Sequence, residues 1–186
     1  MSKTQEAPGE LELVRRFVNT FDLEQDEDTL STPAALDAWL TDAGLAATQT
    51  AATRADLSRA IALREALRAV LLSHNDETAA PAEAAEVIDS AACRARLRLR
   101  FNAACGAWLE PEAAGVSAAL GRLLAVIERS AAQGTWDRLK ACRWHTCEWA
   151  FYDHTKNHSG TWCTMDVCGN RAKARAYRER QAGARA

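Results

Sequence analysis

Hydrophobic side chains recur every three or four residues along most of the first 135 positions, a pattern that predicts a body built mainly of helices. Five helices are predicted in this way, at residues 10–22, 33–43, 54–73, 81–92 and 112–133. Local signals support their ends, since Ser31 or Thr32 caps the second helix and Gly44 and Gly134 follow the second and the fifth.

The periodicity changes at residues 94–101, where four arginines alternate with Ala95, Leu97, Leu99 and Phe101. A period of two predicts a strand with one buried face, and Gly106 allows a turn into a second strand at 107–109. Outward arginines on such a strand favour a solvated face over a nucleic-acid groove. The expected fold class is therefore mainly α (α+β), with one small β-hairpin in the helical part.

Basic and acidic residues are distributed unevenly along the chain. Residues 140–186 hold nine Lys and Arg side chains against four acidic ones, whereas the remaining residues hold 14 basic and 21 acidic side chains. A basic end on an acidic body indicates that this end meets a polyanion, or that its basic residues solvate an exposed helix. No apolar run approaches the roughly 20 residues of a membrane span, and the polar start lacks the apolar stretch of a signal peptide. We therefore expect a cytoplasmic protein with reduced cysteines and no membrane partner.

Four of the six cysteines form two pairs with the same internal spacing, Cys142 with Cys147 and Cys163 with Cys168, and fifteen residues separate the pairs. Four thiolates that two loops bring together are the preferred ligands of a structural zinc ion, and a segment this short needs such support to fold. We predict one zinc per chain, with the intervening segment folded back as a hairpin. The expected domains are residues 1–135, a helical body, and residues 136–186, a zinc finger.

Other residues with ligand chemistry are expected to stay outside the metal site. His145, His154 and His158 lie in polar, loop-like surroundings, and four cysteines already complete a tetrahedral shell. Cys93 and Cys105 are separate from the cluster and are expected to be small buried residues or neighbours in the hairpin.

A run of helix-forming residues follows Cys168 and contains Arg171, Lys173, Arg175, Arg178 and Arg180. Arg171, Arg175 and Arg178 recur at helical spacing, and Lys173 and Arg180 are expected to flank them. A basic helix anchored by a metal site is a common means of presenting arginines to DNA phosphates or base edges. Arg171, three residues after Cys168, is also placed to brace the thiolate shell.

The two cysteine pairs, followed by Cys168-Gly169-Asn170-Arg171, resemble the CGNR zinc-finger family of bacterial stress-induced transcription regulators. The segments FVNT at 17–20, PAALDAWL at 33–40 and LREALR at 63–68 are similar to the helical ABATE domain that accompanies this finger. The resemblance covers almost the whole chain. It implies a finger that binds DNA, with Asn170 among the contacts, and a helical domain that senses an effector.

The ABATE-like motifs also suggest a ligand site in the body. Asn19 and Thr20 can offer hydrogen bonds, and Arg64 and Arg68 lie four residues apart on one helix face, where they can hold an anion. The structural alternative, slightly favoured, is that Asn19 ties neighbouring segments and the arginines pair with Glu65 or the acidic loop.

The sequence allows three classes of function to be compared, and for the basic helix RNA stays open as a partner beside DNA. A DNA-binding regulator leads, with a body that senses a small-molecule effector or forms a homodimer. A zinc-stabilised protein–protein adaptor without nucleic-acid binding is the alternative. An enzyme is not expected, because the sequence has no phosphate-binding loop, no zinc-protease helix and no nucleophile beside a base.

Overall fold

The computed structural model describes residues 6–48, 50–76, 78–104 and 106–183. Within these ranges the chain forms six α-helices: α1 (Leu11–Val18), α2 (Pro33–Asp42), α3 (Arg54–Ser73), α4 (Ala82–Ala95), α5 (Gly115–Ala132) and α6 (Asn170–Gly183). The mainly helical fold class is confirmed. Across the described residues, no helix combines the length and apolar character that crossing a membrane requires.

Side-chain caps define where the central helices begin. The Thr32 hydroxyl accepts a hydrogen bond from the amide of Ala35, and Pro33 occupies the first turn of α2. Thr53 and Asp56 form a reciprocal capping box at the start of α3. Because such caps satisfy amides that a helix end leaves unpaired, they fix the helix starts that the sequence predicted.

Three two-stranded antiparallel hairpins accompany the helices: β1 (Phe21–Asp22) with β2 (Glu27–Asp28), β3 (Leu97–Phe101) with β4 (Ala107–Pro111), and β5 (Leu139–Ala141) with β6 (Ala150–Tyr152). The sequence predicted the β3–β4 pair in the body but missed β1–β2. The finger hairpin was misplaced: it encloses the first cysteine pair instead of lying between the two pairs, since Leu139 pairs with Tyr152.

The β3–β4 hairpin differs from the prediction of a half-buried strand. Its register pairs Leu99 with Leu109 and Phe101 with Ala107, yet Leu99 is 57% exposed and Phe101 is 69% exposed. Only the base of the hairpin packs, at Leu97, against the body. Of the two alternatives for Cys93, burial is wrong, because the residue is exposed near the end of α4, the helix that leads into β3. Cys105 lies outside the described residues.

One hydrophobic core runs through the helical body and into the start of the finger. Phe17, Leu36, Leu63, Leu67 and Leu123 are fully buried at its centre. The same cluster includes four residues of the finger hairpin, namely Leu139, Ala141, Ala150 and Tyr152. The β5–β6 hairpin therefore packs as part of the body, and the rest of the finger extends from it.

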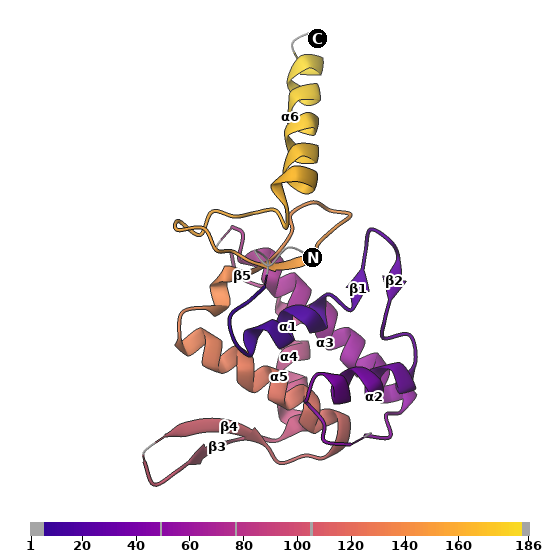
Figure 1. Ribbon diagram of the computed structural model, residues 1–186, viewed down its shortest axis with the longest axis vertical. Coiled ribbons are helices and arrows are strands. Elements are labelled where there is room, and N and C mark those ends of the chain that lie inside the picture. Colours follow the sequence, from indigo (N-terminus) through magenta and orange to yellow (C-terminus); the bar gives the residue numbers. More distant parts are fainter. Residues whose placement is uncertain (1–5, 49, 77, 105, 184–186) are drawn as a thin grey trace.

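Figure 1 shows an elongated molecule with two projections. Helix α6 extends from the finger at one end, and the β3–β4 hairpin extends from the body at the other. The finger loops, which include a short helical turn at Trp136–Arg138 and a π-helical turn at Met165–Gly169, lie between α6 and the body.

Candidate metal centre and basic helix

The four cysteines come from two parts of the finger. Cys142 follows β5, and Cys147 lies in the loop that leads to β6. Backbone bonds shape this loop, since the amide of Cys142 donates to Trp149 O at 3.0 Å and that of Cys147 donates to Trp144 O at 2.8 Å. Cys163 lies in the following loop, and Cys168 belongs to the π-helical turn directly before α6.

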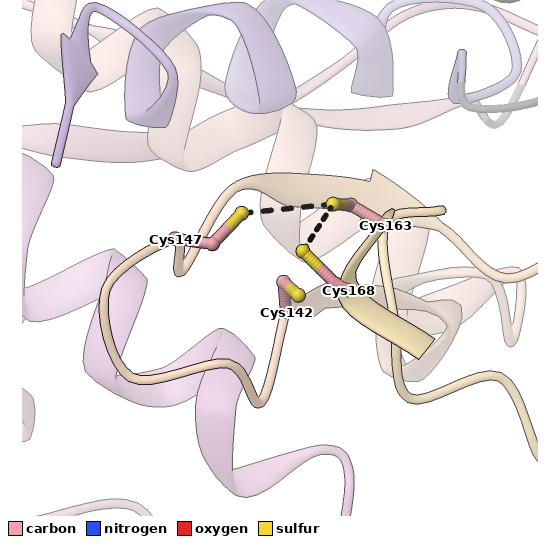
Figure 2. Close-up of side chains that lie close together, drawn as sticks. All are labelled: Cys142, Cys147, Cys163 and Cys168. Carbon is pink, nitrogen blue, oxygen red and sulfur yellow. Dashed lines mark hydrogen bonds between the residues drawn. The ribbon is translucent and has the colours of Figure 1, made fainter. Parts of the chain in front are cut away.

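The four sulfur atoms converge on a single point (Figure 2), and all lie within 4.8 Å of one another. Cys147 Sγ is 3.6 Å from Cys163 Sγ, which is 3.7 Å from Cys168 Sγ. Zinc–sulfur bonds of about 2.3 Å in a tetrahedron place the sulfurs about 3.8 Å apart. The donor set and its spacing therefore fit one zinc ion held by Cys142, Cys147, Cys163 and Cys168.

The electrostatics of the four thiols are those of a site that a cation would stabilise. Hydrogen bonds from the thiols of Cys147 and Cys163 lower the pKa of Cys142. Hydrogen bonding to Cys142 and its charge raise the pKa of Cys163, and burial together with the same charge raises that of Cys168. One thiolate thus opposes ionisation of its neighbours. A divalent metal ion supplies the positive charge that allows four thiolates to coexist, and it links the hairpin loop to the start of α6.

Aromatic side chains shield the cluster, and among the described residues no histidine belongs to its group of ligand atoms. Trp144, Trp149 and Trp162 pack around the sulfurs. His154 contacts the backbone oxygen of Glu6 at 2.9 Å, and His158 lies 3.9 Å from Asp137. Among the described residues, the ligand cluster at this place contains cysteines alone, as predicted.

A buried ion pair that the sequence analysis missed supports the loop before Cys163. Lys140 Nζ lies 3.0 Å from Asp153 Oδ2, and the two side chains are 4% and 1% exposed. Lys140 also donates to the carbonyls of His158 and Gly160, and Asp153 accepts from the amides of Thr155 and Gly160. A Cβ at Gly160 would lie 2.7 Å from Asp153 Oδ1, so this close approach requires glycine.

Helix α6 carries the predicted nucleic-acid residues away from the finger. Asn170 begins the helix and donates to Asp166 O at 3.0 Å. Arg171 pairs with Glu24 of the body at 2.6 Å, and Arg175 pairs with Glu179 at 2.9 Å on the same helix. From Lys173 to Ala182 the side chains are exposed, apart from half-buried Ala176.

The basic residues of α6 occupy two sides of the helix. A repeat of 3.6 residues per turn places Arg171, Arg175 and Arg178 on one side. Lys173 and Arg180 fall on the opposite side, with exposed Tyr177 between them, instead of flanking the first set as predicted. Within the described residues, Lys173, Arg178 and Arg180 form no ion pair.

The body residues proposed to hold a ligand contact protein groups. Asn19 forms two hydrogen bonds with Ala150 of β6, donating to its carbonyl at 2.9 Å and accepting from its amide at 2.7 Å. The Thr20 hydroxyl donates to Phe17 O at 2.7 Å. Asn19 therefore joins the end of α1 to the finger hairpin.

Arg64 and Arg68 of α3 are buried, and all their side-chain nitrogens have partners. Arg64 binds both carboxylate oxygens of Asp28, at 2.8 and 3.0 Å, and also donates to Glu65 and Thr20. Arg68 donates to Glu65, to the carbonyls of Val18 and Phe21, and to Glu148 O in the finger at 2.9 Å. These contacts are the ones expected if the residues tie parts of the protein together. A ligand role for Asn19, Thr20, Arg64 and Arg68 stays a prediction.

A helical body, a four-cysteine zinc site and a projecting basic helix define a two-part zinc-finger protein. Residues 11–135 match the ABATE family, described as "Putative stress-induced transcription regulator", and residues 138–181 match the CGNR zinc finger. The chain therefore belongs to the ABATE family and carries a CGNR zinc finger, as the sequence motifs indicated. No curated protein matches the chain. Both matching families are of the regulator and zinc-finger type, not of an enzyme type.

Proposed function

We propose that the protein is a DNA-binding transcriptional regulator, in which the zinc site directs α6 onto a duplex. The observation that carries the proposal is the position of α6, which extends beyond the finger (Figure 1) and whose sequence holds five basic residues and one acidic residue, Glu179. An exposed helix of 14 residues is about 21 Å long and marginally stable alone, so it gains order from a binding partner.

The shape and charge of this helix suit duplex DNA. A helix fits the major groove, which is about 12 Å wide, and arginines there bind phosphates or the edge of guanine. We assign contacts with DNA to Asn170, Arg171, Lys173, Arg175, Arg178 and Arg180. The acidic body is repelled by phosphate, so DNA approaches the basic end.

Zinc contributes by fixing the direction of α6. Cys168 lies in the turn before Asn170, and Cys142 lies at the end of β5, which packs in the core of the body. A metal bound by both residues fixes the orientation of α6 relative to the β5–β6 hairpin. We place the protein in the cytoplasm, where it has access to the chromosome, and assign the helical body a sensing role without naming an effector.

Selection of bound fragments from random duplex DNA, with the zinc-loaded full chain, tests this proposal. We expect an enriched sequence whose affinity falls as salt increases, because phosphate contacts release counterions. The matched control is the Arg175→Gln, Arg178→Gln double variant with zinc in place, which should enrich the sequence less strongly than the wild type. If the zinc-loaded wild type selects no sequence and binds no duplex at low salt, the adaptor function replaces the regulator.

A further inference from the structure

One of the four zinc ligands is more accessible than the others. Cys142, Cys147 and Cys168 are buried, at 0%, 7% and 1% exposed, whereas Cys163 is half-buried. The sulfur of Cys163 also lies next to two other sulfurs, 3.6 Å from that of Cys147 and 3.7 Å from that of Cys168 (Figure 2). The most accessible ligand residue therefore holds its sulfur beside two possible partners for a disulfide.

Two depressions in the surface lead to Cys163. A groove of about 730 Å³ is lined by residues 151–155 and 159–166, with Cys163 among them. A smaller cavity of about 220 Å³ lies between the β1–β2 turn and the cluster, and Cys147, Cys163 and Cys168 line it. Because a water molecule occupies about 30 Å³ in the liquid, both spaces admit a reagent that is little larger than water.

Zinc ligation gives the four cysteines the chemical form that peroxides attack. A cysteine binds zinc as a thiolate, and the thiolate is also the nucleophile that reacts with a peroxide. Susceptibility to oxidation depends on thiolate character and on exposure together. All four ligands share the thiolate character, and Cys163 is the most exposed of them. Cys163 is therefore the ligand that a small peroxide should oxidise first.

We propose that Cys163 is an oxidation site for small peroxides, and that its oxidation opens the metal centre and releases α6. The thiolate of Cys163 attacks one oxygen of hydrogen peroxide. An S–O bond forms, the O–O bond breaks, and the hydroxide that leaves takes up a proton to give water. The product at Cys163 is a sulfenic acid, which lies beside the sulfurs of Cys147 and Cys168.

The second step joins Cys163 to a neighbouring ligand. The thiolate of Cys147 or Cys168 attacks the sulfur of the sulfenic acid, so a disulfide forms and a second hydroxide leaves, which becomes water with another proton. The two cysteines together lose two electrons, and the peroxide accepts both. Dithiols such as dithiothreitol reverse the reaction by exchange with the disulfide.

Loss of two thiolates separates α6 from the body. The two cysteines that remain do not complete a tetrahedral shell, so the site loses its zinc. Cys142 follows β5, which packs in the core, and Cys168 lies in the turn before α6, so the shared ion links the helix to the hairpin. Without this link α6 has no fixed orientation. The further consequence, that the oxidised protein releases DNA, rests on the proposed regulator function.

Treatment of the zinc-loaded full chain with hydrogen peroxide tests the proposal without DNA, so its failure is distinct from failure of the regulator function. A colorimetric chelator should detect release of the zinc ion. Peptide mapping by mass spectrometry should find a disulfide that contains Cys163, and dithiothreitol with added zinc should restore the metal site. Cys93 is exposed outside the cluster and is the internal reference, which should be oxidised later because it is not a zinc ligand.

Two substitutions by histidine compare Cys163 with a buried ligand. An imidazole can replace one thiolate in a zinc site, so Cys163→His and Cys142→His each leave three thiolates and one imidazole as ligands. Cys142→His is the matched control, because it keeps the accessible thiolate of Cys163 beside Cys147 and Cys168. Peroxide should release zinc from Cys163→His at least about fivefold more slowly than from Cys142→His, since oxidation depends on exposure of the thiolate.

Several results would overturn the proposal. Zinc that stays bound in peroxide while Cys163 remains reduced is one of them. A disulfide that lacks Cys163, or oxidation of Cys93 before any zinc ligand, is another. Equal rates of zinc release from the two histidine variants would also contradict it. If either variant fails to bind zinc, the first cysteine that peroxide oxidises in the wild type decides the question.

Discussion

Arg171 Nη1 lies 2.6 Å from Glu24 Oε1, so the first turn of α6 is tied to the turn between β1 and β2 of the body. The Glu24 carboxylate raises the pKa of Arg171. Both side chains are exposed by more than a third, and solvent screens the attraction within such a pair strongly. The contact is therefore weak enough to exchange, and a DNA phosphate would compete with Glu24 for the same guanidinium.

Glu24→Gln should increase the affinity of the protein for DNA. The substitution removes a negative charge beside α6 and releases Arg171 for a phosphate, an effect of about twofold to fivefold at low salt. Fluorescence anisotropy with the selected duplex measures this change. Glu27→Gln, in the same hairpin but without an ion pair to α6, is the control and should have a smaller effect. Weaker binding by Glu24→Gln would mean that Glu24 positions Arg171 instead of competing for it.

The helical elements that the sequence predicted best are those with strong local signals. The limits of α3 agree with the prediction at 54–73, because Thr53 caps its start and its apolar stripe is continuous. The β1–β2 hairpin was missed because two-residue strands are too short to display a period. For Leu99 and Phe101, alternation predicted the strand correctly but could not show that the apolar face would extend past the body.

The features of the candidate site also differ in whether a local sequence pattern predicts them. The cysteine spacing predicted a zinc site whose four sulfurs the structure brings together. Asn19 and Ala150 are 131 residues apart, and Arg68 and Glu148 are 80 apart, so no local pattern indicates that they join the body to the finger. Nothing in the sequence distinguishes Lys140 and Asp153 from exposed charged residues. Their burial as a pair is visible only in the structure.

Removal of zinc should detach α6 without unfolding the body. Loss of the metal leaves four closely spaced thiols whose ionised forms repel one another, and the loops that they join lose their link. A chelator, or Cys163→Ser, should abolish zinc binding and decrease helical circular dichroism by the share that α6 contributes. Cys93→Ser, which alters an exposed cysteine outside the cluster, should change neither. Full helicity in a zinc-free Cys163→Ser protein would contradict this expectation.

The buried pair of Lys140 and Asp153 should make a large contribution to stability. Lys140→Met leaves a buried carboxylate unpaired, at a cost of about 3–5 kcal/mol in the free energy of unfolding. Denaturant titration of the zinc-loaded protein measures this cost. Lys156→Met changes an exposed lysine in the adjacent loop and is the control, with an expected change near zero.

The same pair predicts a particular dependence on pH. Burial raises the pKa of Asp153, but hydrogen bonds from Thr155, Lys140 and Gly160 outweigh it and lower the pKa to about 2. A lowered pKa gives stability that is fully present above the unfolded value, near 3.8, and is lost as pH falls through the folded value. The stability difference between wild type and Asp153→Asn should stay constant from neutral pH down to about 4 and shrink below it. A difference that shrinks between pH 7 and 5 would contradict this assignment.

A fragment of residues 1–135 should fold as a helical domain but with reduced stability. Its five helices contain most of the core, yet truncation removes Leu139 and Tyr152, two buried side chains worth together about 3–6 kcal/mol. Truncation also removes Ala150, to which Asn19 is hydrogen-bonded. Thermal unfolding should be cooperative, at a temperature below that of a fragment ending at residue 160, which keeps β5–β6. Equal melting temperatures would show that the hairpin adds nothing to the body, and a fragment without a cooperative transition would show that the two parts fold only together.

The salt dependence of binding should reveal which side of α6 faces DNA. Three to five phosphate contacts per chain give a slope of log affinity against log salt of roughly −3 to −4, and twice that for a dimer. The double variants Arg175→Ala, Arg178→Ala and Lys173→Ala, Arg180→Ala remove the same charge from opposite sides of the helix. We expect the first variant to flatten the slope by about two units and the second to flatten it less, because Arg175 and Arg178 share a side with Arg171.

The measurement also separates phosphate contacts from base recognition. If Arg175 or Arg178 binds a guanine, its loss should cost about 1–3 kcal/mol and relax specificity at one base pair, without the full change in slope. Arg54→Ala removes an exposed arginine of the body and is the control that should leave affinity unchanged. If both double variants flatten the slope of log affinity against log salt equally, phosphates contact α6 on two sides. If no binding occurs at about 50 mM salt with zinc in place, where non-specific attraction to DNA is strong, α6 binds an acidic protein and the adaptor function holds.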